Sequence, residues 1–217
     1  MFEYLFFFMQ YLWVFMIVLL IVAVAYSMRK SKELRQVFEN QAMKRNGRVN
    51  GFLSTLRLTF PYKNHTVVVS TYPGSRYSSP YTRVDVDVDN RGNKNLTIYD
   101  ESWSSSIGKL FGMRDIQLGV DSFDSKFVIK GNDTYFINSL LTLQIQDKLL
   151  AIHPLHPMLT LHHNQLRLNV PTVLSDEASI DVLLDTALLI VDRLSELQYG
   201  TEEKDFTFQE DLNPTPL

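Results

Sequence analysis

The longest uncharged, apolar run in the sequence lies near its N-terminal end, from Leu5 to Tyr26. At about 1.5 Å rise per residue, a helix over this run spans about 33 Å, which is enough to cross a hydrocarbon core of about 30 Å. We therefore predict a transmembrane anchor over residues 1–27. The rest of the chain is expected to be a polar appendage held at the membrane surface.

A cleaved signal peptide is the alternative for this run, because Ala23-Val24-Ala25 has the small-x-small pattern of a cleavage site. No basic residue precedes the run, however, and it exceeds the roughly 7–15 residues of a signal peptide's apolar region. These two features favour an uncleaved, single-pass anchor.

Basic residues gather directly after the apolar run, at Arg29, Lys30, Lys32 and Arg35. Positively charged flanks of membrane helices stay in the cytoplasm, so we expect the N-terminus outside and the large domain inside, at the cell membrane. The same four residues are expected to lie at the membrane interface, against anionic lipid headgroups.

The first half of the anchor is rich in aromatic residues, with Gln10 and Trp13 among them. One hypothesis is that this half contacts a partner subunit, with Gln10 hydrogen-bonding across the contact. The other, which we favour, is a lipid-facing helix whose Gln10 lies close enough to the interface to stay hydrated.

Composition excludes several classes of function. The formal net charge is −3, which argues against nucleic acid as a partner. The sequence has no cysteine, so it forms no disulfide, no thiolate metal site and no cysteine nucleophile. About 190 residues outside the anchor indicate one globular domain.

The segment after the anchor, residues 28–47, is predicted to be a basic helical stalk that continues the membrane helix. An apolar stripe at three- and four-residue spacing marks it, and Gly47 is a helix stop. A stripe this short is expected to pack on its own domain rather than in a coiled coil. Its members are Leu34, Val37, Phe38 and Ala42.

Residues 48–198 are predicted to form an α+β domain, an antiparallel sheet packed by helices. From Arg48 to Asp100 apolar and polar residues alternate with period two, and turn residues separate the runs. Such alternation is typical of an antiparallel meander with one buried face. Leu96 and Ile98 are expected to continue the meander after the strand of Val84, Val86 and Val88.

Helices and a hairpin are predicted for the second half of the domain. We expect short helices at Ser104–Phe111, from Asp133 or Thr134 to Leu141, and from Thr142 to about Ile152, with a strand at Lys126–Lys130. A hairpin is expected at Met158–Val170. The last helix is predicted from Asp176 to Leu197, with Ser175 as its cap.

The tail, residues 199–217, is acidic and ends in Asn-Pro-Thr-Pro-Leu, so we expect it to be disordered. Within it, Phe206 and Phe208 are candidates to add a strand to the sheet edge of a protein partner.

Three aspartates alternate along one predicted strand, at Asp85, Asp87 and Asp89. A calcium loop would need Gly at position 90 and Glu at 96, where the chain has Asn90 and Leu96. Alternate side chains of a strand lie roughly 7 Å apart, too far to chelate one ion without a bend. A solvated face that protects a sheet edge is the better interpretation.

Four histidines lie close together in the sequence, and imidazole is a ligand of zinc. Prolines interrupt the group, and no HExxH helix is present, so we predict loop histidines without a metal. They remain the candidate metal ligands of the chain: His153, His156, His162 and His163.

No cofactor is predicted, because the motifs that would bind one are incomplete. Gly108-Lys109 lacks the earlier glycine of a phosphate-binding loop, where Trp103 stands instead. Serines 104–106 lack the glycines of a hydrolase nucleophile elbow.

The segment Phe123–Thr142 resembles a segment of uncharacterised bacterial membrane-anchored domains, with the pattern F-x-x-x-F-x-V, then D, then L-L-T. The resemblance implies a prokaryotic membrane protein and brings no catalytic residues to this chain. The matching residues are Phe123, Phe127, Ile129, Asp133, Leu140, Leu141 and Thr142.

The leading hypothesis is a non-enzymatic, single-pass membrane protein whose cytoplasmic domain binds proteins or scaffolds a membrane complex. It predicts an exposed aromatic patch around Tyr72, Tyr77 and Tyr81. A second hypothesis is a ligand-binding or enzymatic domain with a pocket formed by the His153–His163 region and the aspartate strand. A third is a lipid-contacting domain that uses the basic stalk.

Overall fold

The strands form one antiparallel sheet in a computed structural model, which describes residues 2–52, 55–103 and 115–210, with side chains for 11–52, 55–103 and 115–198. Across the described residues the sheet has nine strands in the order β1-β2-β3-β4-β9-β8-β5-β7-β6. The strands are β1 (Arg48–Phe52), β2 (Thr55–Tyr62), β3 (His65–Tyr72), β4 (Tyr81–Asp87), β5 (Leu96–Asp100), β6 (Asp115–Ile116), β7 (Phe127–Gly131), β8 (Met158–His162) and β9 (Gln165–Val170).

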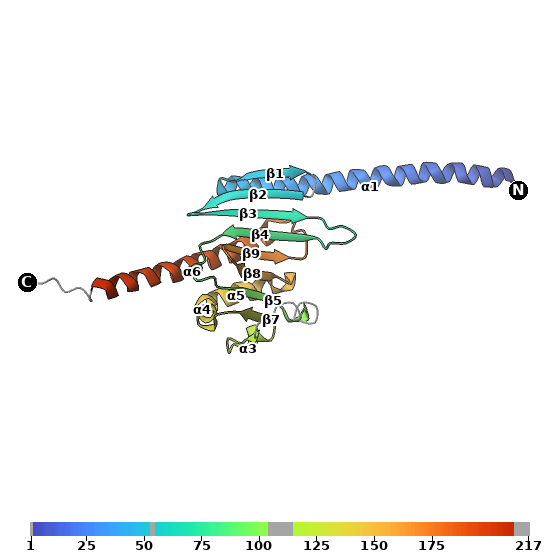
Figure 1. The fold of residues 1–217 in the computed structure, drawn as a ribbon. Coiled ribbons are helices and arrows are strands. Elements are labelled where there is room, and N and C mark those ends of the chain that lie inside the picture. The colour runs from blue at the N-terminus through green and yellow to red at the C-terminus, as the bar shows by residue number, and fades with distance from the viewer. Residues whose placement is uncertain (1, 53–54, 104–114, 211–217) are drawn as a thin grey trace, which may run out of the picture.

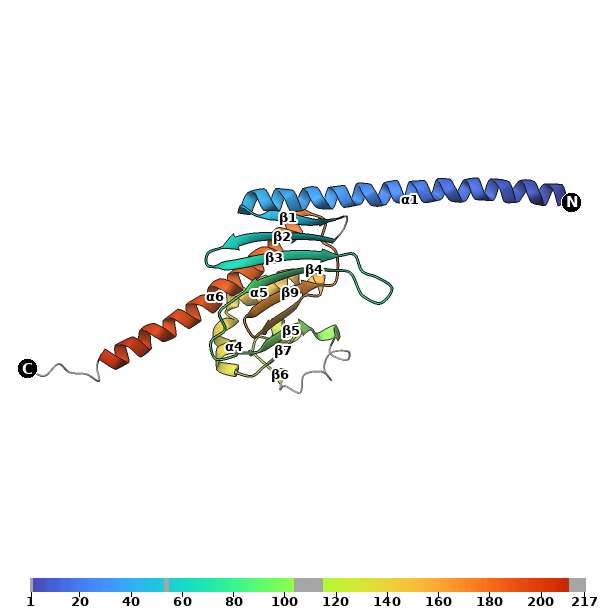
Figure 2. The ribbon, with the colours of Figure 1, turned by 45° about the horizontal axis from the view of Figure 1, so that its top comes forward.

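The helices lie at the two ends of the chain and between β5 and β8. They are α1 (Phe2–Arg45), η1 (Glu101–Trp103), α3 (Asp121–Asp124), α4 (Thr134–Leu140), α5 (Leu143–Ile152), η2 (His153–Leu155) and α6 (Glu177–Glu210). Helices α4, α5 and α6 cover one face of the sheet, and α1 runs along the β1–β2 end of it (Figures 1 and 2). The predicted α+β class is confirmed.

The alternation of apolar and polar residues corresponds to alternating burial in the strands, as predicted. In β2, β3 and β4 every second residue is buried, and these residues face the helices as part of one core. Because successive side chains of a strand point to opposite faces, one face of this part of the sheet is dry and the other wet.

The strand order corrects the predicted meander. Strands β1 to β4 do follow one another, but β5 is not next to β4, because the β8–β9 hairpin lies between them. Strand β4, which carries Asp85 and Asp87, is therefore an inner strand, and these aspartates do not protect a sheet edge. Local periodicity detects each strand but carries no signal of its distant partners.

Helix α1 is continuous from the apolar stretch into the domain. It has 44 residues, so the predicted anchor and stalk are one helix. Leu34, Phe38 and Ala42 are buried in the domain core, as the stripe predicted. The helix ends where Asn46 turns left-handed at φ 53° and the amide of Gly47 donates to the carbonyl of Ala42 at 2.8 Å.

The side chains at three predicted helix starts differ in whether they cap the helix. Asp133 caps α4, since its carboxylate accepts the amide of Phe136 at 2.9 Å. Thr142 precedes α5 but makes no side-chain cap. The cap residue before α6 is Asp176, which accepts the amide of Ser179 at 2.8 Å, rather than the predicted Ser175.

Helix α6 runs to Glu210, so it extends into the segment that we expected to be disordered. Residues 202–204 are Glu-Glu-Lys, which favour helix, and a helix that is already nucleated propagates at little cost. Phe206 and Phe208 thus belong to a helix rather than to an extended strand. The predicted helix at Ser104–Phe111 lies outside the described residues.

Replacing Phe38 by Ala is expected to lower the free energy of unfolding by about 3–5 kcal/mol, because its side chain is 1% exposed and leaves a cavity. Urea unfolding of the chain in detergent micelles measures the change. The matched control is Met43→Ala on the same helix, where the side chain is exposed and little change is expected. Equal effects at both positions would show that α1 is not part of the core.

Candidate functional site

The four histidines form two separate pairs. His153 and His156 precede β8, with ring centroids 6.3 Å apart, whereas His162 ends β8 and His163 follows it, with ring centroids 3.9 Å apart. Strand β8 has five residues and extends over about 17 Å, so the two pairs do not form one site. The described residues include no group of three or more histidine or acidic side chains placed to hold a metal ion.

The first pair is joined to an aspartate that the sequence analysis missed. Asp100, at the end of β5, is 4% exposed. Its Oδ2 lies 2.7 Å from Nδ1 of His156 and 3.2 Å from Nε2 of His153, and its Oδ1 accepts the amide of Ser102 at 2.8 Å. We call Asp100, His153 and His156 the aspartate–histidine cluster.

The surroundings of Asp100 act on its pKa in opposite directions. Burial raises the pKa, but hydrogen bonds from Ser102 and His156, together with the charge of His153, lower it by more. The pKa of Asp100 is therefore below its ordinary value, and the carboxylate stays ionised in the fold. In the sequence, Asp100 is distinguished only as an acidic residue at the end of a predicted strand, which does not reveal its histidine partners.

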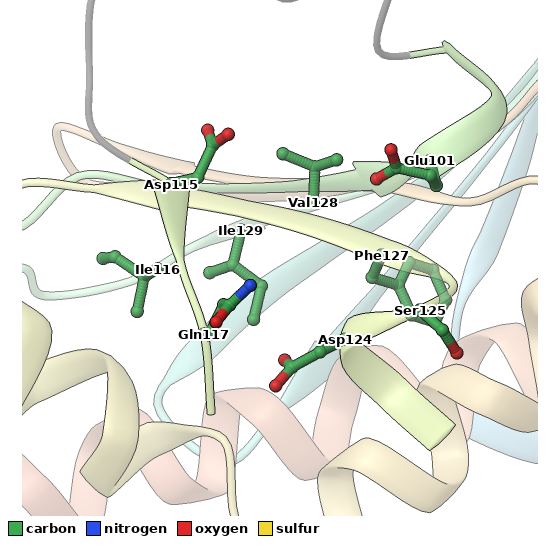
Figure 3. A pocket seen from close by; sticks show the side chains of 9 residues that line it. All are labelled: Glu101, Asp115, Ile116, Gln117, Asp124, Ser125, Phe127, Val128 and Ile129. Atoms are coloured by element: carbon green, nitrogen blue, oxygen red, sulfur yellow. The ribbon is translucent and has the colours of Figure 1, made fainter. Parts of the chain in front are cut away.

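A pocket of about 380 Å³ lies beside the cluster, against β6, β7 and α3 (Figure 3). Phe127 separates the two, because it lines the pocket while its ring meets that of His153 edge-on at 5.2 Å. The lining residues are Glu101, Asp115, Ile116, Gln117, Asp124, Ser125, Phe127, Val128 and Ile129.

The carboxylates in this pocket are engaged by the protein itself. Asp124 accepts the backbone amides of residues 118–120 at 2.8–3.2 Å, which holds the loop before α3. Asp115 lies 3.2 Å from the ammonium of Lys130. Two of the three acidic residues in the lining therefore have a structural role.

The aspartate strand does not reach the aspartate–histidine cluster. Asp85 is held between two arginines, at 2.8 Å from Arg83 and 2.7 Å from Arg167. Asp89 pairs with Arg91 at 2.7 Å. Since β9 and β8 separate β4 from β5, the predicted common pocket of the aspartates and histidines does not form.

Of the three tyrosines predicted to form an exposed aromatic patch, Tyr72 and Tyr81 are half-buried at the base of the connection between β3 and β4. The rings of Tyr72 and Tyr81 stack with centroids 5.4 Å apart. Tyr77, at the tip of the connection, is 89% exposed.

The N-terminal part of α1 is apolar and exposed. The described stretch of this helix from Tyr11 is long and apolar enough to cross a membrane, and its apolar window is not buried against the protein. Trp13 is exposed, and the side chain of Gln10 lies outside the described part. Of the basic flank, Arg29 and Arg35 pair with Glu33 and Glu39 one turn on.

A polar junction fixes the C-terminal end of α1 to the start of α6. Glu177 accepts from Asn40 at 2.5 Å and from Lys44 at 2.9 Å, and Asp181 lies 2.9 Å from Arg45. Hydrogen bonds from Asn40 and Lys44 lower the pKa of Glu177. Sequence reasoning missed this junction, because its partners are more than 130 residues apart.

Comparisons with known proteins show similarity in fold only. No protein-family model and no curated protein matches the sequence. Among solved structures, the chain is similar to the crystal structure of the mycobacterial trehalose monomycolate transport factor A, TtfA, with a TM-score of 0.51 and 10% identity. The match covers 76% of this chain and 94% of that one.

Replacing Asp100 by Asn is expected to destabilise the fold at pH 7 by about 1–3 kcal/mol, because a buried charge-assisted acceptor is lost. A lowered folded-state pKa means that the ionised group stabilises the fold above its unfolded-state pKa of about 3.9 and loses this effect in acid. The stability gap between wild type and variant should therefore close as the pH falls below about 4.

Urea unfolding midpoints from pH 7 to pH 3 measure this gap. Glu101→Gln, at the neighbouring exposed residue, is the control and should keep the wild-type stability at pH 7. A gap that stays constant across this range would show that ionised Asp100 contributes nothing to stability.

Proposed function

We propose that the chain is a non-enzymatic, single-pass membrane protein whose cytoplasmic domain is an interaction module or scaffold of a membrane complex. The lipid bilayer and at least one further protein are its partners. The observation that carries this proposal is the continuity of α1, which passes from the apolar stretch into the domain core without a linker.

A helix that is both anchor and core element holds the domain in one orientation. Leu34 and Phe38 are buried against the sheet, and the polar junction ties the end of α1 to α6. A domain tethered to capture a diffusing substrate has no need of such a fixed stalk. A scaffold needs one, because its binding surfaces must lie at set positions relative to the membrane.

Helix α6 provides the surface that we assign to a protein partner. It leaves the domain on the side opposite to the N-terminal part of α1 and projects beyond the sheet (Figures 1 and 2). Phe206 and Phe208 lie in this projecting part. Residues two apart lie on nearly opposite sides of a helix, so we propose that one of the two phenylalanines docks in a groove of the partner, in place of strand addition.

The structural neighbour supports the same class of role without identifying a substrate. Its name describes a transport factor, and the word factor names no reaction. We propose for this chain an accessory role in a bacterial membrane complex, in line with the resemblance of Phe123–Thr142 to bacterial membrane-anchored domains.

A second candidate function is a ligand-binding or enzymatic domain. The aspartate–histidine cluster favours it, because an ionised, buried carboxylate that orients two imidazoles is a common arrangement for proton transfer. The adjacent pocket of about 380 Å³ would then receive a small ligand.

Gentle extraction from the native membrane into detergent, followed by sizing, mass spectrometry and metal analysis of one peak, separates the two candidates. We expect an assembly larger than the single chain, with reproducible protein companions and no bound metal. Replacing Phe206 and Phe208 by Ser should remove those companions, because the proposed helix contact loses its apolar side chains.

The matched control is Tyr135→Ser, which removes an exposed aromatic ring from α4 and should leave the assembly intact. A chain that runs alone with a stoichiometric metal or small molecule would contradict the scaffold and support the second candidate.

A further inference from the structure

The connection between β3 and β4 projects from the sheet in the same direction in which α1 runs toward its apolar part. In both views it extends past the ends of the neighbouring strands, in the direction of the N-terminus (Figures 1 and 2). We define residues 73–80 as the β3–β4 turn. Its direction brings it toward the membrane that α1 is proposed to cross.

Strand register fixes where this turn begins relative to α1. Arg35 donates to the carbonyl of Gly51 at 3.5 Å, and Gly51 pairs with Leu56. The amide of Leu56 donates to the hydroxyl of Thr71 at 3.2 Å, and Thr71 pairs with Thr82. One row of residues across β1 to β4 therefore lies at the level of Arg35.

The reach of the turn matches the distance to the end of the apolar stretch. From Arg35 back to Tyr26 are nine residues of helix, or about 13.5 Å. From Tyr72 to Tyr77 are five residues, which span up to about 16 Å when extended. At its longest extension the tip of the turn could reach the level of Tyr26, where interfacial aromatic residues are expected.

The turn is braced rather than loose. Tyr72 and Tyr81 stack at its base, and the amide of Ser75 donates to the carbonyl of Ser78 at 2.8 Å near its tip. Gly74 has φ +87°, and a Cβ there would lie 3.0 Å from the nitrogen of Pro80. These contacts stabilise one conformation of the β3–β4 turn.

The tip carries the two side chains that suit a lipid headgroup layer. Arg76 and Tyr77 are both exposed, and the guanidinium lies 5.9 Å from the tyrosine ring centroid. Within the part of the chain that the structure describes, no carboxylate pairs with Arg76. Tyrosine favours the membrane interface, and arginine is attracted to anionic headgroups.

We propose that the β3–β4 turn rests, through Arg76 and Tyr77, in the headgroup layer of the membrane that α1 crosses, and that it binds anionic lipid there. This makes a second membrane contact besides the basic stalk, and it assigns to lipid an aromatic patch that the sequence suggested for a protein. The inference rests on the proposed membrane anchoring of α1.

The chain has no cysteine, so single cysteines can report on each position in the full-length protein in lipid nanodiscs. Ser78→Cys places a fluorophore at the tip and keeps Arg76 and Tyr77. Asn64→Cys places it in the β2–β3 turn at the opposite end of β3, and Val18→Cys places it within the apolar stretch. Quenchers attached to lipid headgroups and acyl chains then measure contact with the bilayer.

In discs rich in phosphatidylglycerol we expect severalfold stronger lipid quenching at Ser78→Cys than at Asn64→Cys, and strong quenching at Val18→Cys. Adding Arg76→Ser and Tyr77→Ser should lower the Ser78→Cys signal to the Asn64→Cys level. Adding Arg57→Ser and Tyr135→Ser, which remove an exposed arginine and tyrosine elsewhere, should leave it unchanged. Phosphatidylcholine discs should weaken the contact, because the charge attraction is lost.

Quenching at Val18→Cys without quenching at Ser78→Cys would overturn the inference while leaving the membrane anchor in place. A Ser78→Cys label that is shielded from aqueous iodide but not quenched by lipid would also overturn it, because a protein would then cover the turn. No quenching at Val18→Cys would instead contradict the proposed anchoring itself.

Discussion

The burial of one face of α1 in the domain core is the interaction on which the rest of the structure depends. Leu34, Phe38 and Ala42 supply apolar surface that the β1–β2 end of the sheet would otherwise expose to water. Because the same helix continues into the apolar stretch, each of these contacts also fixes the domain relative to that stretch. In the proposed function, anchoring and folding are thus properties of one element.

The polar junction between α1 and α6 extends this coupling to the far side of the domain. Glu177 and Asp181 sit in the first turns of α6, where acidic residues also complement the helix dipole, and they accept from Asn40, Lys44 and Arg45. The two long helices are therefore joined to each other, and both pack on the sheet, α1 on β1 and β2 and α6 on β4 and β9. The apolar part of α1 and the C-terminal part of α6 leave the domain on opposite sides (Figures 1 and 2).

The sequence predicted those features that depend on local spacing. The alternating Val84 and Val86 predicted β4, and the stripe of Leu34 and Phe38 predicted the packed face of α1, because burial repeats with the period of the element. The position of the β8–β9 hairpin was not predictable, since its pairing with β4 and β5 depends on contacts between distant residues. The end of α6 was missed because acidic composition was taken as a sign of disorder.

The candidate site shows the same contrast between features that depend on local spacing and contacts between distant residues. Four nearby histidines suggested one cluster, but β8 separates them, and Asp100 joins one pair from a distant strand. Of the predicted patch, Tyr77 is exposed, whereas Tyr72 and Tyr81 are half-buried. The direction of the β3–β4 turn depends on the register of four strands relative to α1, which local spacing does not reveal.

The most direct test of this account measures the distance between spin labels on α1 and on the domain, in the full-length protein in lipid nanodiscs. Labels at Lys32→Cys and Asn64→Cys should give one narrow distance distribution, because a single packed helix joins the two sites. Inserting a Gly-Gly-Ser segment after Lys32 should broaden it. A broad distribution without the insertion would show that the domain moves freely on its anchor, and would contradict the fixed stalk.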